Sequence, residues 1–133
     1  MLETAREALA SFHPSGSFEP RVLDLWAIVA PAGGWLAPHQ HYPAPWSGVL
    51  WVSAEHTASG ELGADSAGRL ELMNPVPLAE SFGQARGATI APKDGVLVLF
   101  PGVLDHFVHP ARAIEPRVSL SFNLDVVQRP PAP

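Results

Sequence analysis

The stretch Pro38-His39-Gln40-His41-Tyr42-Pro43 decides how the rest of the chain is interpreted. It places two histidines two residues apart, with a proline on either side. In a β-strand, side chains at this spacing point to the same face about 7 Å apart, so His39 and His41 could bind one metal ion. In a helix the two side chains would diverge. A metal site here therefore requires a β-structure, which the remaining sequence must supply.

Predicted strands, separated by turns, follow one another along most of the chain. The 15 proline and 11 glycine residues argue against a helical bundle. Residues 31–34 would join the first two strands as a hairpin, and residues 59–67 and 78–87 are predicted to be irregular. Eight short strands indicate a mainly β fold, a sandwich or a small barrel such as a jelly roll. Their predicted ranges are 21–29, 35–41, 47–54, 69–73, 88–91, 96–100, 104–109 and 117–127.

Three segments carry further structural information. Residues 1–20 form a lead-in, in which apolar residues at helical spacing predict a short amphipathic helix over 2–12. Residues 96–100 are apolar without alternation, which predicts a strand covered on both faces, whereas 88–91 would be an edge strand. The proline-rich tail 129–133 is expected to be frayed.

The composition excludes several classes of protein. A length of 133 residues suits one domain, 1–133, with a real core. The net charge is −5 and no basic patch is present, which argues against nucleic acid as a partner. The absence of cysteine excludes disulfides, thiolate metal sites and a cysteine nucleophile. Neither a secretory leader nor a bilayer-length apolar run is found, so we expect a cytoplasmic protein with no membrane partner. A homodimer is one open possibility for its assembly.

The last predicted strand divides its side chains by parity. Arg117, Ser119, Ser121 and Asn123 share one face, and apolar residues share the other. One interpretation is a surface strand with its polar face in water, and parity alone favours it. The other is that the polar face lines a pocket, where the arginine fork and a nearby hydroxyl would bind a carboxylate.

A third histidine follows the predicted buried strand. Imidazole suits Fe, Zn, Cu and Ni, so His106 could complete a metal site whose remaining positions stay open for substrate or O₂. His56 and His109 lack such a pattern and are predicted to be surface residues. The four tryptophans are mostly core candidates, and one of Trp35 and Trp46, which flank the histidine pair, could line a pocket.

Taken in order, four motifs resemble a group of 2-oxoglutarate- and Fe(II)-dependent oxygenases. In that group an H-x-H-P-like segment leads into S-G-V-x-Y/W-V, a G-x-L-x-x-F-P segment leads into L-x-H, and R-x-S-x-S-F-N closes the core. The corresponding segments here are residues 39–52, Gly95 to Pro101, Leu104-Asp105-His106 and residues 117–123. The resemblance covers residues 21–125, and the order and spacing of the motifs make it fairly specific.

The resemblance implies a double-stranded β-helix, or jelly-roll, fold with iron at its open mouth. By analogy His39 and His106 would be metal ligands, and His41 would be the third, at a position where the wider superfamily carries a carboxylate. Arg117 would bind the distal carboxylate of 2-oxoglutarate, with Ser119 beside it. The implied reaction uses O₂ and 2-oxoglutarate to hydroxylate a small molecule or a peptide. The short chain would be either a minimal catalytic core or a domain of a longer protein.

Two other interpretations stay open. A cupin with metal-dependent dioxygenase or isomerase activity shares the jelly roll, the H-x-H pair and a later histidine, and Gly95 to Pro101 resembles its second motif. However, a cupin carries a glutamate soon after the second histidine, where this chain has Ala44-Pro45-Trp46, and it has no need for Arg117-x-Ser119. The third interpretation is a non-catalytic β-sandwich binding module with incidental histidines, which predicts no metal uptake.

Overall fold

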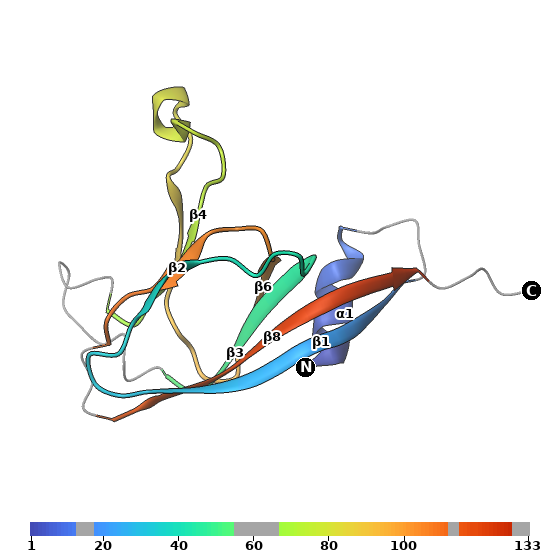
Figure 1. Cartoon of the computed structure of the whole chain (residues 1–133), viewed down its shortest axis with the longest axis horizontal. Coiled ribbons are helices and arrows are strands. Elements are labelled where there is room, and N and C mark those ends of the chain that lie inside the picture. Colours follow the sequence, from blue (N-terminus) through green and yellow to red (C-terminus); the bar gives the residue numbers. More distant parts are fainter. Residues whose placement is uncertain (13–17, 55–66, 112–114, 129–133) are drawn as a thin grey trace, which may run out of the picture.

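The computed structural model describes residues 1–12, 18–54, 67–111 and 115–128. These form one N-terminal helix and two four-stranded antiparallel sheets, with strand orders β1-β8-β3-β6 and β2-β7-β4-β5 (Figure 1). The elements are α1 (Leu2–Ala10), β1 (Phe18–Ala30), β2 (Leu36–His39), β3 (Trp46–Ser53), β4 (Leu70–Met73), the 3₁₀ helix η2 (Ala79–Phe82), β5 (Gly87–Ile90), β6 (Leu97–Pro101), β7 (His106–Val108) and β8 (Arg117–Gln128). The predicted jelly roll with a short N-terminal helix is therefore confirmed.

The predicted hairpin between the first two strands is wrong. β1 pairs along its whole length with β8, from Phe18 opposite Gln128 to Ala30 opposite Arg117, whereas β2 joins the other sheet and pairs with β7. The turn after β1 is responsible, because the backbone N–H of Gly33 donates to the carbonyl of Ala111. That bond directs the chain toward the segment that follows β7, so β2 crosses between the sheets.

Two apolar clusters hold the layers together. Between the sheets, Trp51 of β3, Leu70 of β4 and Phe100 of β6 form the buried centre of one cluster. On the outer face of the β1-β8-β3-β6 sheet, Ala5 of α1 packs with Phe122, Leu124 and neighbours that include Leu97 and Leu99 of β6. The side chains of β6 therefore reach both clusters, as its unbroken apolar sequence predicted.

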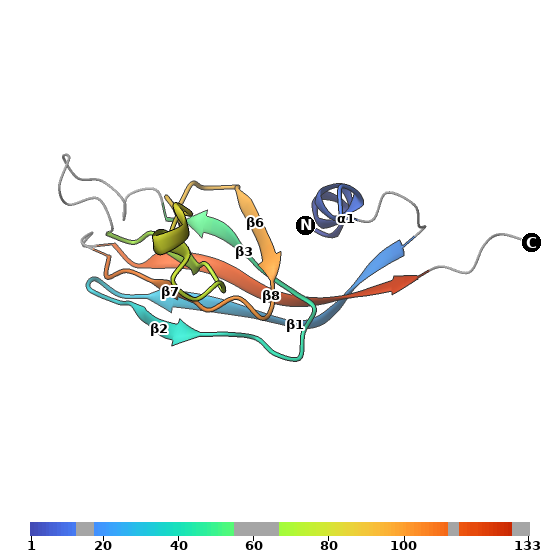
Figure 2. The same cartoon turned by 90° about the horizontal axis from the view of Figure 1, so that it is seen from above.

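The long strands β1 and β8 run side by side along the molecule, and α1 lies toward their outer end (Figure 2). A β-bulge interrupts β1 between Val22, which is opposite Leu124, and Asp24, which is opposite Asn123. The extra residue reverses the alternation of the strand. Val22 consequently packs with the α1 cluster, whereas Trp26 faces the interior between the sheets.

The connection between β4 and β5 is more ordered than predicted. It contains η2 within the range expected to be irregular, and Figure 1 shows this connection projecting from the body of the molecule. β5 is an edge strand, as predicted. The predicted loop 59–67 lies largely outside the described residues, as does the tail 129–133. None of the helices in the described ranges is long and apolar enough to cross a membrane.

Candidate active site

Three histidines meet at one end of the space between the sheets. His39 ends β2 and lies directly opposite His106, the first residue of β7. His41 lies just beyond β2, where its backbone N–H donates to the carbonyl of Gly102 at 2.8 Å. One ring nitrogen from each of the three lies within 4.8 Å of the others. The expectation that both early histidines share one strand is thus wrong for His41, but the three rings do converge.

Two of the three imidazoles are held in a single tautomer by the backbone. Nδ1 of His39 lies 2.7 Å from the carbonyl oxygen of Ala37, and Nδ1 of His106 lies 2.9 Å from that of Leu104. A carbonyl oxygen can only accept, so Nδ1 carries the proton in both rings. The neutral rings therefore present the lone pair of Nε2, which is the form that binds a metal.

The electrostatics of the cluster favour neutral rings. Burial, together with the nearby His39 and His41, lowers the pKa of His106 to about 4, against the opposing effects of the hydrogen bond to Leu104 and of the Asp105 charge. Burial and the proximity of His39 also lower the pKa of His41, with Asp24 opposing the shift. Near neutral pH no proton has to leave His106 before a cation binds. A set of three imidazoles suits a divalent transition metal.

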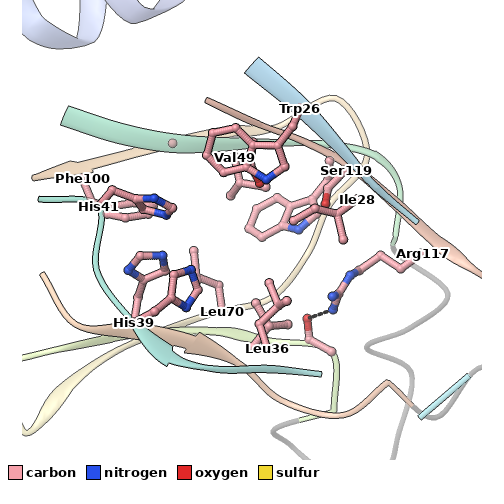
Figure 3. A pocket seen from close by; sticks show the side chains of 16 residues that line it. Trp26, Ile28, Leu36, His39, His41, Val49, Leu70, Phe100, Arg117 and Ser119 are labelled. Carbon is pink, nitrogen blue, oxygen red and sulfur yellow. Dashed lines mark hydrogen bonds between the residues drawn. The ribbon is translucent and has the colours of Figure 1, made fainter. Parts of the chain in front are cut away.

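A cavity of about 270 Å³ extends from the histidines into the space between the sheets. Figure 3 shows His39 and His41 at one end and Arg117 at the other, with Ile28 and Leu36 between them. Most of the lining surface is apolar, so a ligand inside would be largely shielded from water. The imidazoles and the guanidinium stand at opposite ends, which suits an elongated ligand with a polar group at each end.

The polar face of β8 lines this cavity and not the solvent. Ser119 and Ser121 contribute to the wall, and Arg117 is only 2 % exposed. The surface-strand interpretation that parity alone favours is therefore wrong. The only hydrogen bond of the Arg117 guanidinium within the described ranges is a long one, 3.5 Å, to the carbonyl of Gly68.

No carboxylate of the described residues pairs with Arg117. Burial lowers its pKa from the ordinary value, yet a guanidinium still carries its charge at neutral pH. A buried cation with no counter-ion is costly. The inner end of the cavity is consequently suited to an anion, and a carboxylate matches the arginine fork.

Other candidates from the sequence lie away from the cavity. His109 pairs with Glu71 at 2.8 Å, and His56 lies outside the described residues. Trp35 is 60 % exposed and is not part of the core, and neither it nor Trp46 lines the cavity. The tryptophans that do line it are Trp26 and Trp51.

Sequence reasoning missed Asp24, which lines a neighbouring open pocket together with His41. A carboxylate in the middle of the apolar strand Val22 to Val29 is a signal that could have drawn attention to it. Asp24 is exposed, and its place on the same face of β1 as Trp26 depends on the β-bulge, which alternation alone does not predict.

Several solved structures share this fold. A 2OG-Fe(II) oxygenase family oxidoreductase from Burkholderia pseudomallei matches with a TM-score of 0.64 and 14% identity, over 90% of this chain and 50% of that one. A Pseudomonas putida prolyl-4-hydroxylase matches with a TM-score of 0.56 and 20% identity, over 98% of this chain and 64% of that one. A prolyl 4-hydroxylase of Phytophthora capsici matches with a TM-score of 0.55 and 22% identity, over 91% of this chain and 39% of that one. The chain thus spans from two fifths to just under two thirds of these proteins.

Comparison of the sequences gives the family. No curated protein sequence matches the chain. A family model described as "Putative 2OG-Fe(II) oxygenase" matches residues 24–123, which include the three converging histidines and the polar face of β8. The match covers most of the sequence, and the chain belongs to this 2OG-Fe(II) oxygenase family.

Proposed function

We propose that this protein is a 2-oxoglutarate- and Fe(II)-dependent oxygenase that hydroxylates a C–H bond of a small molecule or a peptide. His39, His41 and His106 would hold the metal, and Arg117 with Ser119 would hold the distal carboxylate of 2-oxoglutarate. The observation that carries the proposal is one cavity with the three imidazoles at one end and, at the other, a buried guanidinium that no carboxylate of the described residues pairs with. Membership of the family supports the same reaction class.

The residues of the chain have distinct tasks in this proposal. His39 and His106 direct Nε2 toward the cation, because backbone carbonyls hold the protons on Nδ1. The Arg117 fork and the Ser119 hydroxyl donate hydrogen bonds to one carboxylate and so orient the co-substrate along the cavity. The apolar walls exclude water, which strengthens these charge interactions. Bound Fe(II) would supply the O₂ activation that couples decarboxylation of 2-oxoglutarate to hydroxylation of the substrate.

Anaerobic titration with Fe(II) and 2-oxoglutarate tests the proposal. The wild-type protein should develop the weak visible absorption band of a 2-oxo acid bound to Fe(II). Arg117→Met should require far more 2-oxoglutarate to reach the same band. Asp105→Ala, a change at an exposed carboxylate beside His106, should behave as wild type.

The two alternatives predict different outcomes of this titration. A cupin-type enzyme would bind the metal without the 2-oxoglutarate band. A binding module with incidental histidines would take up no metal. Either result in the wild-type protein would overturn the oxygenase proposal, whereas the family match and the buried Arg117 both favour the band.

A further inference from the structure

His41 differs from the other two histidines in what holds its ring. Backbone carbonyls accept hydrogen bonds from the rings of His39 and His106, but the part of the chain that the structure describes gives the His41 ring no such partner. A metal-bound histidine almost always donates its second ring N–H to a carboxylate, a carbonyl or water. The third ligand position therefore requires an acceptor that the backbone does not supply.

Asp24 is the carboxylate nearest to meeting this requirement. It and His41 line the same open pocket, next to the cavity that holds the three imidazoles, and among the described residues no other acidic side chain lines that pocket. Asp24 and His41 therefore border one pocket, in which the Asp24 side chain is exposed.

Hydrogen bonds from two buried side chains lead to the exposed carboxylate of Asp24. The hydroxyl of Ser47 donates to Oδ1 of Asn123 at 2.7 Å, and Nδ2 of Asn123 donates to Oδ2 of Asp24 at 3.1 Å. Ser47 and Asn123 are both buried. These bonds fix the direction of the Asn123 amide and engage Oδ2 of Asp24, whereas Oδ1 accepts no hydrogen bond from the described residues.

We propose that Asp24 is a positioning residue for His41, accepting a hydrogen bond from the ring N–H that does not face the metal, directly or through one water. The inference rests on the proposed metal site. In the wider superfamily a carboxylate occupies the position of His41 and binds the metal directly. In this proposal Asp24 supplies that negative charge from behind His41. Removal of a partner of this kind typically weakens metal binding by roughly ten- to a hundredfold.

The test uses Zn(II) alone as a diamagnetic probe of the full chain. Isothermal titration gives the affinity, and ¹H–¹⁵N correlation spectra of the Zn(II)-loaded protein report each hydrogen-bonded ring N–H. Wild type should show three such signals, one from each of His39, His41 and His106. Asp24→Ala should lose the His41 signal, keep the other two and bind Zn(II) roughly ten- to a hundredfold more weakly.

Asp105→Ala is the matched control, because it removes an exposed carboxylate beside His106 that does not line either pocket. It should keep all three signals and bind Zn(II) as wild type does. If the alanine variant folds poorly, Asp24→Asn is used instead, because it retains the side-chain volume. It should weaken the His41 signal and Zn(II) binding in the same direction, but by less. An unchanged His41 signal and affinity in the Asp24 variants would overturn the role of Asp24 alone. Absence of Zn(II) uptake by wild type would overturn the metal site as well.

Discussion

Replacement of Arg117 by methionine should stabilise the ligand-free protein and weaken its binding of 2-oxoglutarate. The guanidinium is 2 % exposed, and the described residues offer it only one long hydrogen bond and no carboxylate. Among the described residues its charge therefore has no counter-ion in the ligand-free protein. Methionine keeps an unbranched apolar stem of similar length and removes the charge.

The two effects have opposite signs and different sizes. Relief of an uncompensated buried charge should add about 1–3 kcal/mol to the free energy of unfolding. For a chain of this size that corresponds to a rise in Tm of roughly 3–10 °C. Loss of the arginine–carboxylate contact should cost about 3 kcal/mol of binding free energy or more, which is roughly a hundredfold in Kd.

Thermal unfolding of the metal-free protein, in buffer without phosphate, sulfate or carboxylate, measures the first effect. Titration of the Zn(II)-loaded protein with 2-oxoglutarate measures the second. Arg21→Met is the control, because Arg21 is 63 % exposed and pairs with Asp125 at 2.7 Å on the surface. It should lower stability by less than about 1 kcal/mol and leave 2-oxoglutarate binding unchanged. If Arg117→Met is less stable than wild type without ligand, the guanidinium is compensated by the protein itself and the reasoning is refuted.

Three further predictions concern the wall of the site and its histidines. His41→Ala should weaken Fe(II) binding at least a hundredfold in an anaerobic competition assay, and wild-type affinity would rule out the three-histidine site. Gly48→Ala should destabilise the fold by about 1–3 kcal/mol in urea unfolding, because the added Cβ would lie 2.5 Å from Phe122 Cζ and 2.7 Å from the Val98 carbonyl; a neutral result would contradict this packing. The metal-free protein should lose on the order of 2–3 kcal/mol as pH falls from 6.5 to 4. The unfolded chain protonates His106 at its ordinary pKa of 6.5, whereas the folded state resists protonation down to about 4. Urea unfolding across this range should show a weaker pH dependence in His106→Gln.

The strands could be predicted because their signals are local. Proline and glycine mark the turns, and the alternation in residues 117–127 or the apolar run in 96–100 is visible without knowledge of any partner strand. Strand pairing is not local. The turn after β1 looks like a hairpin by sequence, but its bond to Ala111 forms only when a segment almost 80 residues away is in place. Local sequence patterns therefore could not predict which sheet β2 joins.

The sequence predicted which residues form the candidate site better than it predicted how they are arranged in space. His39, His41 and His106 converge as expected, but Gly102 holds His41 outside the strand that the H-x-H spacing suggested. Parity shows that Arg117 shares a face with polar residues and says nothing about whether that face meets water or the second sheet. The face of β1 on which Asp24 and Trp26 lie depends on one extra residue in that strand, which reverses the parity of everything after it.

Charge balance connects the departure at His41 to the rest of the proposed site. Three neutral imidazoles leave a divalent metal with both of its positive charges, and Arg117 adds a third at the inner end of the cavity. Bound 2-oxoglutarate would contribute two negative charges, so one positive charge would remain in a mostly apolar enclosure. Such a residual charge is costly unless a counter-charge lies close by. Asp24, in the pocket that borders His41, is placed to be that counter-charge, with Asn123 orienting it. The proposed site would thus retain the carboxylate of the usual ligand set, moved from the metal to the residue behind its third ligand.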